Sequence, residues 1–298
     1  MKIRAGGPRR GCPRHSRSKV ARRLCCLAMI VAHGTVAAYE GRAHQQLTFI
    51  AAMQFNQCVS ELENVPRLTA LQVRYVARAE WRFSRKVARW PYYDGRYADR
   101  KRLLWFIQTR LHEHFDAAVA KLAAADDLRG KYGNLGVIVN LIQDMTSPAH
   151  VVPVFTTRWW RFSFADRFNT YDVDERAVEE ALGDYCMPLE SGGETFASVL
   201  HRTAEDTRAA VRSPMLDMPT TWEAIWTFGD PGDFGEYGNA GNNFGRLTRF
   251  DCGDAERCVL LKDDRLYASF ALERHLRAVR ATMAAMLVAQ RQAGGDLR

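Results

Sequence analysis

The spacing of apolar residues along the chain predicts a protein built from helices. Apolar side chains recur every three or four residues over long stretches. That period places them on one face of a helix, which packing against a neighbour then buries. No stretch alternates apolar and polar residues long enough to predict an extended strand. We therefore expect a mainly α protein, a single-domain helical bundle. Its predicted helices cover 44–58, 104–122, a central helix from 135, 173–184, 195–211, 219–228 and 264–290.

The most apolar of these helices carries polar residues that its core position does not require. Residues 135–150 read LGVIVNLIQDMTSPAH, and Asn140 and Asp144 lie four apart, on one helical face. Ser147-Pro148 should turn the chain so that His150 points back towards the same side. A buried carboxylate needs a cation, hydrogen-bond donors or a metal ion. An Asp and a His that converge predict a metal site; alternatively, Asp144 braces the bundle and His150 stays at a helix end.

A glycine-rich segment interrupts the helical pattern. Residues 229–245 contain six glycines in seventeen positions, among mostly polar residues. That composition predicts turns and not regular structure. A loop this long is uncommon unless it is functional, so we interpret it as a substrate-facing loop, with a surface connection as the alternative. After it, residues 246–250 and 258–261 are expected to form a small hairpin.

The charge of the chain is concentrated at its N-terminus. Residues 1–38 hold nine Lys or Arg and no Asp or Glu, which leaves 33 of the 42 basic side chains against 34 acidic ones. A basic start, a short apolar run at 24–32 and small residues before Tyr39 are typical of a secretory signal peptide. We therefore predict a signal peptide at 1–38, a mature domain at 39–298, and a secreted or periplasmic protein. With a net charge of −1, the mature chain gives no charge-based argument for nucleic acid or membrane as a partner.

Four cysteines remain after that cleavage. They are Cys58, Cys186, Cys252 and Cys258. In an exported chain they suit two disulfides, with Cys252–Cys258 closing a small loop and Cys58–Cys186 as the other candidate, although three pairings are open in principle. No spacing among them matches the Cys-x-x-Cys of a metal site.

The central motif resembles the signature of the zinc-dependent phospholipase C and single-strand nuclease superfamily. In that family the motif is a His, three residues, an Asp, five residues and a His, with a Pro two before the last His. This chain keeps Asp144, Pro148 and His150, and has Asn140 in the place of the first His. The family also uses the amino group of its mature N-terminus as a zinc ligand, and its nuclease branch has a His five residues later. Cleavage after residue 38 leaves Tyr39 first and His44 five residues on.

The rest of the family's ligand set is partly kept. The resemblance places the next acidic ligand at Glu80 and aligns the family's His-Phe-Tyr-Asp-Pro with residues 90–94, WPYYD, where Trp90 replaces the His. A later His and acid correspond to Phe168 and Asp172, so the His is again missing. The resemblance therefore implies six ligands: the Tyr39 amine, His44, Glu80, Asp144, His150 and Asp172. Asn140, Trp90 and Phe168 stand at the three positions where a ligand of the family is replaced.

Other histidines could occupy the missing places. His112 or His114 could replace the His lost at 90, but both belong to a predicted apolar helix. His201 and Glu205 have a spacing that puts them on one helical face, although an exposed helix pair explains that spacing equally well.

The resemblance implies a secreted hydrolase of phosphate esters that uses zinc, with fewer than three ions. Glu80 and Asp144 are the expected catalytic residues, and the substrate is a phospholipid or a nucleic acid. A non-catalytic exported protein on the same fold is the main alternative, because three ligand positions are substituted. A membrane-active protein is a third interpretation, which the aromatic residues at 155–164 suggest.

Overall fold

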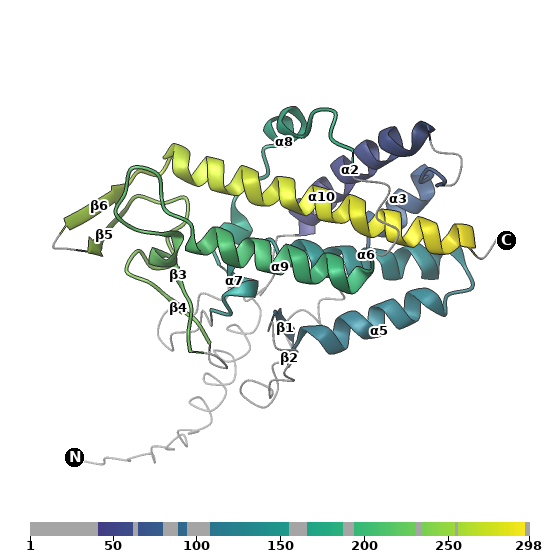
Figure 1. Ribbon diagram of the computed structural model, residues 1–298, viewed down its shortest axis with the longest axis horizontal. Coiled ribbons are helices and arrows are strands. Elements are labelled where there is room, and N and C mark those ends of the chain that lie inside the picture. The colour runs from purple at the N-terminus through teal and green to yellow at the C-terminus, as the bar shows by residue number, and fades with distance from the viewer. Residues whose placement is uncertain are drawn as a thin grey trace, which may run out of the picture. The chain divides into compact units, whose positions relative to one another are not determined.

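The computed structural model describes residues 41–61, 65–79, 89–93, 108–154, 166–186, 194–230, 234–253 and 256–295. All of them belong to one compact unit, Thr35–Arg298. Helices dominate this unit, as the apolar periodicity predicts (Figure 1). None of the described helices is both long enough and apolar enough to cross a bilayer. The α-helices are α2 (Gly41–Cys58), α3 (Ala70–Ala77), α5 (Leu111–Ala123), α6 (Leu128–Asp144), α7 (Pro148–Val151), α8 (Glu175–Leu182), α9 (Phe196–Arg212) and α10 (Arg265–Gly295).

The helix that carries the central motif is the core of the fold. α6 contacts α2, α3, α5, α9 and α10, and Leu135, Ile138, Leu141 and Ile142 on it are fully buried. α3 packs closely on Gly136, where a Cβ atom would lie 2.3 Å from the Val76 carbonyl oxygen. Because α6 is surrounded by helices, its last residue, Asp144, is carried into the interior of the protein.

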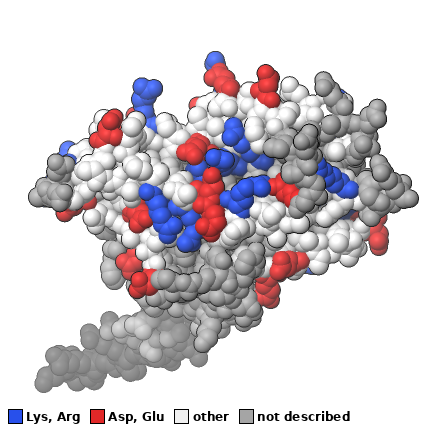
Figure 2. Space-filling model, in the orientation of Figure 1, with Lys and Arg blue, Asp and Glu red and all other residues white. Residues whose placement is uncertain are grey.

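Two further helices frame this core. α10 and α9 lie side by side in Figure 1, and contacts between them, and between α10 and both α2 and α6, confirm the arrangement. On the face in Figure 2, basic and acidic side chains alternate instead of forming a patch of one sign. Between the two helices, Asp206 of α9 forms ion pairs with Arg274 and Arg277 of α10, at 2.9 and 3.4 Å.

Short strands and 3₁₀ turns complete the described chain. The predicted hairpin is confirmed as an antiparallel pair, β5 with β6. The described residues of the segment 229–245 lack long regular elements, as expected, but β4 pairs there with β3. The remaining elements are β1 (Arg89–Tyr92), β2 (Gln108–Arg110), β3 (Trp226–Thr227), β4 (Glu236–Tyr237), β5 (Thr248–Gly253), β6 (Glu256–Leu260), η1 (Val59–Glu61), η2 (Phe168–Thr170) and η3 (Trp222–Ala224).

Three of the predicted helices have the wrong bounds or type. The central helix, expected from residue 135, begins at Leu128. The helix expected at 104–122 begins at Leu111, because residues 108–110 form β2, which pairs in parallel with β1. The helix expected at 219–228 is a 3₁₀ turn followed by β3. In that segment the carbonyls of Ala224 and Ile225 accept from the backbone N–H groups of Ala240 and Gly238. Since those carbonyls bond to a distant loop, they are not available for helical bonds four residues on.

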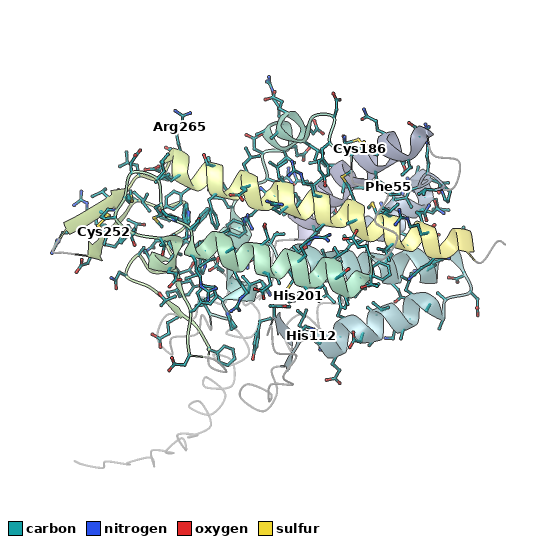
Figure 3. All side chains as sticks on the ribbon, in the orientation of Figure 1. Phe55, His112, Cys186, His201, Cys252 and Arg265 are labelled. Atoms are coloured by element: carbon teal, nitrogen blue, oxygen red, sulfur yellow. A yellow bond between two sulfur atoms is a disulfide. The ribbon has the colours of Figure 1, made fainter. Side chains whose placement is uncertain are left out.

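Both expected disulfides are present. Cys58, at the end of α2, is bonded to Cys186, just after α8, and Cys252 on β5 is bonded to Cys258 on β6. Figure 3 labels Cys186 close to α2 and Cys252 on the hairpin. Two disulfides are compatible with an extracellular protein.

Candidate metal centre

The structure brings together two of the predicted ligands, His44 and Asp144. His44 lies in the first turns of α2, and Asp144 is the last residue of α6. The distance between His44 Nε2 and Asp144 Oδ1 is 3.1 Å, and both side chains are about nine-tenths buried. The two residues are a hundred positions apart in the chain, so the packing of α2 on α6 creates the pair.

A third side chain, Gln143, fixes the orientation of the His44 ring. Gln143 is fully buried, and its amide nitrogen donates to the hydroxyls of Thr48 at 3.1 Å and Thr282 at 3.0 Å. The Thr282 hydroxyl donates its own proton to the Ala278 carbonyl, so towards Gln143 it can only accept. Gln143 must therefore turn its NH₂ group to the threonines and its oxygen to His44.

That orientation assigns the tautomer of His44. The Gln143 oxygen lies 2.6 Å from His44 Nδ1. Because this oxygen can only accept, Nδ1 carries a proton and donates it. Nε2 then faces the Asp144 carboxylate either as a protonated imidazolium or as a lone pair that shares a cation with the carboxylate. Metal-binding histidines commonly use the second arrangement, with the other ring nitrogen donating to a protein oxygen.

The geometry of the pair fits a zinc ion. Zinc binds nitrogen and oxygen ligands at about 2.0 to 2.2 Å in tetrahedral sites, which puts neighbouring ligand atoms about 3.3 Å apart. The 3.1 Å between His44 Nε2 and Asp144 Oδ1 is close to that separation. Within the described part of the chain, no three or more His, Cys, Asp or Glu side chains form a group that could hold a metal. Tyr39 and Glu80, which would complete the set around this pair, lie outside the described residues.

The structure shows what two of the substituted positions do. Asn140 donates its side-chain amide to the Ala79 carbonyl at 3.1 Å, so it holds the residue immediately before Glu80. Phe168 is fully buried, and its ring packs against Phe244 and Trp226, with centroids at 5.2 and 6.2 Å. The side chain of the third position, Trp90, lies outside what the structure describes. Asn140 and Phe168 therefore have structural roles.

His150 lies near a buried acid that sequence reasoning missed. Asp166 accepts hydrogen bonds from Trp226 Nε1 at 2.9 Å and from the Tyr237 hydroxyl at 2.8 Å. Burial raises the pKa of Asp166, while these donors and the nearby His150 act to lower it. Asp166 has no periodic signal in the sequence, and its partners are 60 and 71 residues away. The predicted partner of His150, Asp172, is exposed and lines a cavity instead.

The alternative histidines have other partners. The His112 ring packs against Tyr93, with centroids 5.7 Å apart, and the Tyr93 hydroxyl contacts His201 Nδ1. Figure 3 labels His201 on α9 and His112 on α5. Glu205 lies 3.7 Å from Arg208, in an ion pair of the same helix. These contacts support a structural role for His112, His201 and Glu205.

No model of a known protein family, no curated protein and no solved structure matches this chain.

Proposed function

We propose that this protein is a metal-dependent hydrolase of phosphate esters, similar to the zinc-dependent phospholipases C and single-strand nucleases. The observation that carries the proposal is the orientation of His44, whose Nε2 is aimed at Asp144 by a buried Gln143. Hydrogen bonds from Gln143 to two threonines fix the direction of the glutamine behind His44. Metal-binding histidines commonly have such a hydrogen-bonding partner behind them.

The residues of the proposed site have distinct roles. His44, Asp144 and the amino group of a mature Tyr39 would hold zinc, and Asp144 is the side chain that could reach more than one ion. Glu80 would act as a ligand or as the general base, and His150 and Asp172 would be further ligands. When bound, zinc supplies a Lewis acid for phosphoryl oxygens and lowers the pKa of water to about 7.

A non-catalytic exported protein on the same fold is the second candidate. The observation that favours it is the structural use of the substituted positions, because Phe168 fills an aromatic core and Asn140 holds the Ala79 carbonyl. A chain that has replaced metal ligands with packing residues could keep its fold without chemistry. The two candidates differ in whether the His44–Asp144 pair binds metal and supports turnover.

Hydrolysis of a chromogenic phosphodiester by the purified mature protein separates the two candidates. We expect activity that a chelator removes and added zinc restores, and that His44→Ala and Asp144→Asn each abolish. His201→Ala is the matched control, since His201 is an exposed helix histidine bonded to Tyr93, and it should keep activity. No turnover at any zinc concentration would favour the non-catalytic protein.

A further inference from the structure

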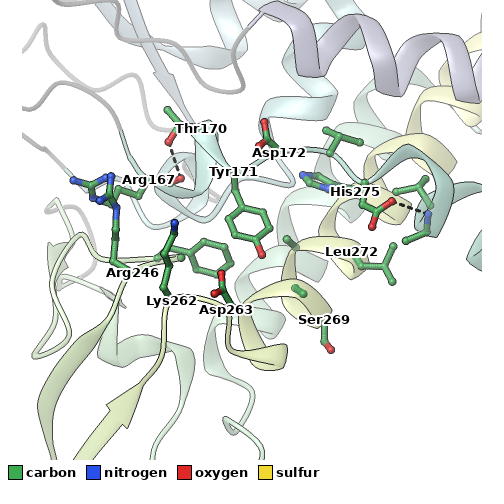
Figure 4. Close-up of a pocket in the computed structure, with 18 residues that line it drawn as sticks. Arg167, Thr170, Tyr171, Asp172, Arg246, Lys262, Asp263, Ser269, Leu272 and His275 are labelled. Carbon is green, nitrogen blue, oxygen red and sulfur yellow. Dashed lines mark hydrogen bonds between the residues drawn. The ribbon is translucent and has the colours of Figure 1, made fainter.

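A cavity of about 730 Å³ opens beside the core, and one of the proposed zinc ligands, Asp172, is among the residues that line it. It is enclosed by residues 167–178, the loop 244–246 and the first turns of α10 (Figure 4). Its volume is in the range of pockets that bind small organic molecules. The loop 244–246 lies close to the segment 167–178. Gly245 has a φ of +69°, and a Cβ atom on it would lie 3.0 Å from the Tyr171 ring. The loop and the segment that carries Tyr171 are therefore in close contact at the cavity.

Three cationic side chains from separate segments of the chain line one side of this cavity. Arg167 precedes η2, Arg246 follows Gly245 and Lys262 follows β6, and Figure 4 shows the three gathered together. In the described part of the structure, no carboxylate lies within 4.0 Å of their side-chain nitrogens, although other arginines of the chain form such pairs. Like charges gathered in this way repel one another, so an anion between them would be stabilised.

One of these cations is held in position before any ligand arrives. The backbone N–H of Arg167 donates to the Asn242 side-chain oxygen at 2.9 Å, and its Nε donates to the Asn242 carbonyl at 3.1 Å. Those bonds leave the two terminal guanidinium nitrogens to donate a pair of hydrogen bonds to an oxyanion. A pre-oriented fork loses less conformational entropy on binding than a flexible side chain does.

The rest of the cavity limits the size and charge of the ligand. The Tyr171 ring lies in the middle in Figure 4, with Phe244 beside it. The hydroxyl of Tyr171 can donate a hydrogen bond. Asp172, Asp174 and Asp263 also line the cavity, and they would repel a long polyanion such as nucleic acid.

We propose that Arg167, Arg246 and Lys262 bind the phosphate group of a small molecule, whose organic part lies against Tyr171 and Phe244. Two guanidinium groups and an ammonium, reaching in from three segments, suit the several oxygens of phosphate better than the two of a carboxylate. The ligand is free phosphate or a phosphate monoester, and both carry the chemistry that these cations recognise. Arg167, Arg246 and Lys262 are not proposed zinc ligands, although the proposed ligand Asp172 lines the same cavity.

Calorimetric titration of the mature protein with inorganic phosphate and with phenyl phosphate, both in the presence of a chelator, tests the proposal. We expect both to bind, and phenyl phosphate to bind more tightly if the ligand is a monoester whose organic part contacts Tyr171. Equal affinities would identify free phosphate as the ligand. No binding of either up to about 10 mM would overturn the proposal. Binding that appears only when the chelator is replaced by zinc would also overturn it, because a metal would then hold the phosphate.

Single substitutions locate the phosphate in the cavity. Arg246 and Lys262 are exposed, so Arg246→Gln and Lys262→Gln should fold normally, which an unchanged melting temperature would verify. Each should weaken phosphate binding about tenfold, as expected for the loss of one charged hydrogen-bond donor. Arg249→Gln is the matched control, since Arg249 is an exposed residue of β5 outside the cavity. An equal loss in Arg249→Gln would show non-specific attraction and contradict the assignment.

Discussion

The single residue that most determines the proposed chemistry is Gln143. It links α6 to α2 through His44 and Thr48, and to α10 through Thr282. The distances in these bonds are 2.6 to 3.1 Å, and the glutamine is fully buried. Without them, the imidazole of His44 could rotate and present either nitrogen to Asp144. Through Gln143, the packing of three helices therefore fixes the direction of His44 Nε2 towards Asp144.

Replacing Gln143 should separate metal binding from stability. Gln143→Ala is expected to lower zinc affinity about 10- to 100-fold, because the outer partner of the His44 ring is lost. It should also cost about 1 to 3 kcal/mol of unfolding free energy. Gln290→Ala is the matched control, because Gln290 is equally buried and bonds to Tyr132 and Pro66. Zinc titration and urea unfolding on both variants test this, and equal zinc affinities would show that Gln143 has no positioning role.

His275 should make the protein acid-sensitive. Burial lowers the pKa of His275 from 6.5 to about 4. Between these values the unfolded chain binds a proton that the folded chain excludes, so unfolding becomes easier as the pH falls through this window. The difference corresponds to about 3 kcal/mol. Urea unfolding at about pH 7 and about pH 4 should show a smaller loss of stability in His275→Gln than in the wild type; equal losses would contradict this account.

Sequence reasoning found the pair of residues but not their support. Asp144 stands out because a carboxylate in an apolar helix needs a partner, and His44 stands out through the resemblance, because it lies five residues after Tyr39. Gln143 does not stand out, since glutamine is common on helices and its partners are 95 to 139 residues away. Asp166 was missed for the same reason. Such partners become visible only when the helices are packed together.

At the scale of elements, the sequence predicts helices well where apolar residues decide the structure. The 264–290 stripe corresponds to α10, and 195–211 to α9. The helix prediction fails at 219–228, where Trp222, Ile225 and Trp226 have helical spacing but Trp226 donates a hydrogen bond to Asp166. There, a distant loop supplies the hydrogen bonds of the backbone. Local periodicity cannot reveal that competition.

The two disulfides should contribute unequally to stability. Cys58 and Cys186 are 128 positions apart, and Cys252 and Cys258 are 6 apart. The chain-entropy model gives about 5 kcal/mol for the long loop and about 2 kcal/mol for the short one. The contact between α2 and the segment after α8 should survive in the Cys58→Ser/Cys186→Ser variant, because Gln54 still donates to the carbonyls of Gly183 and Tyr185. Urea unfolding of the two double variants measures the order, and a larger loss in the short-loop variant would contradict it.

At the scale of the whole molecule, the packing of α2, α6 and α10 brings the proposed site together. α10 contacts both other helices along its length, and its Thr282 orients Gln143. His275 lies seven residues before Thr282, two turns earlier on the same helical face, and lines the phosphate cavity. One helix therefore supports both proposed sites.

The proposed site also depends on where the mature chain begins. We expect secreted protein to start at Tyr39, so that its amino group can join His44 and Asp144. One extra residue would move the amine by up to about 3.5 Å, which is too far for a metal bond near 2 Å. Mass spectrometry of secreted material identifies the first residue, and any residue other than Tyr39 would remove the terminal-amine ligand.

The most direct test of the metal centre is the amount of metal bound per chain. Elemental mass spectrometry of the mature protein, with wild type, His44→Ala and Asp144→Asn prepared in parallel, measures it. We predict about one zinc ion or more per wild-type chain, and a large loss in both variants while each still unfolds cooperatively. If Asp144 only braced the bundle, Asp144→Asn would change the melting temperature and not the metal content. A wild type that binds no added zinc, or a His44→Ala variant with full metal content, would contradict the metal centre.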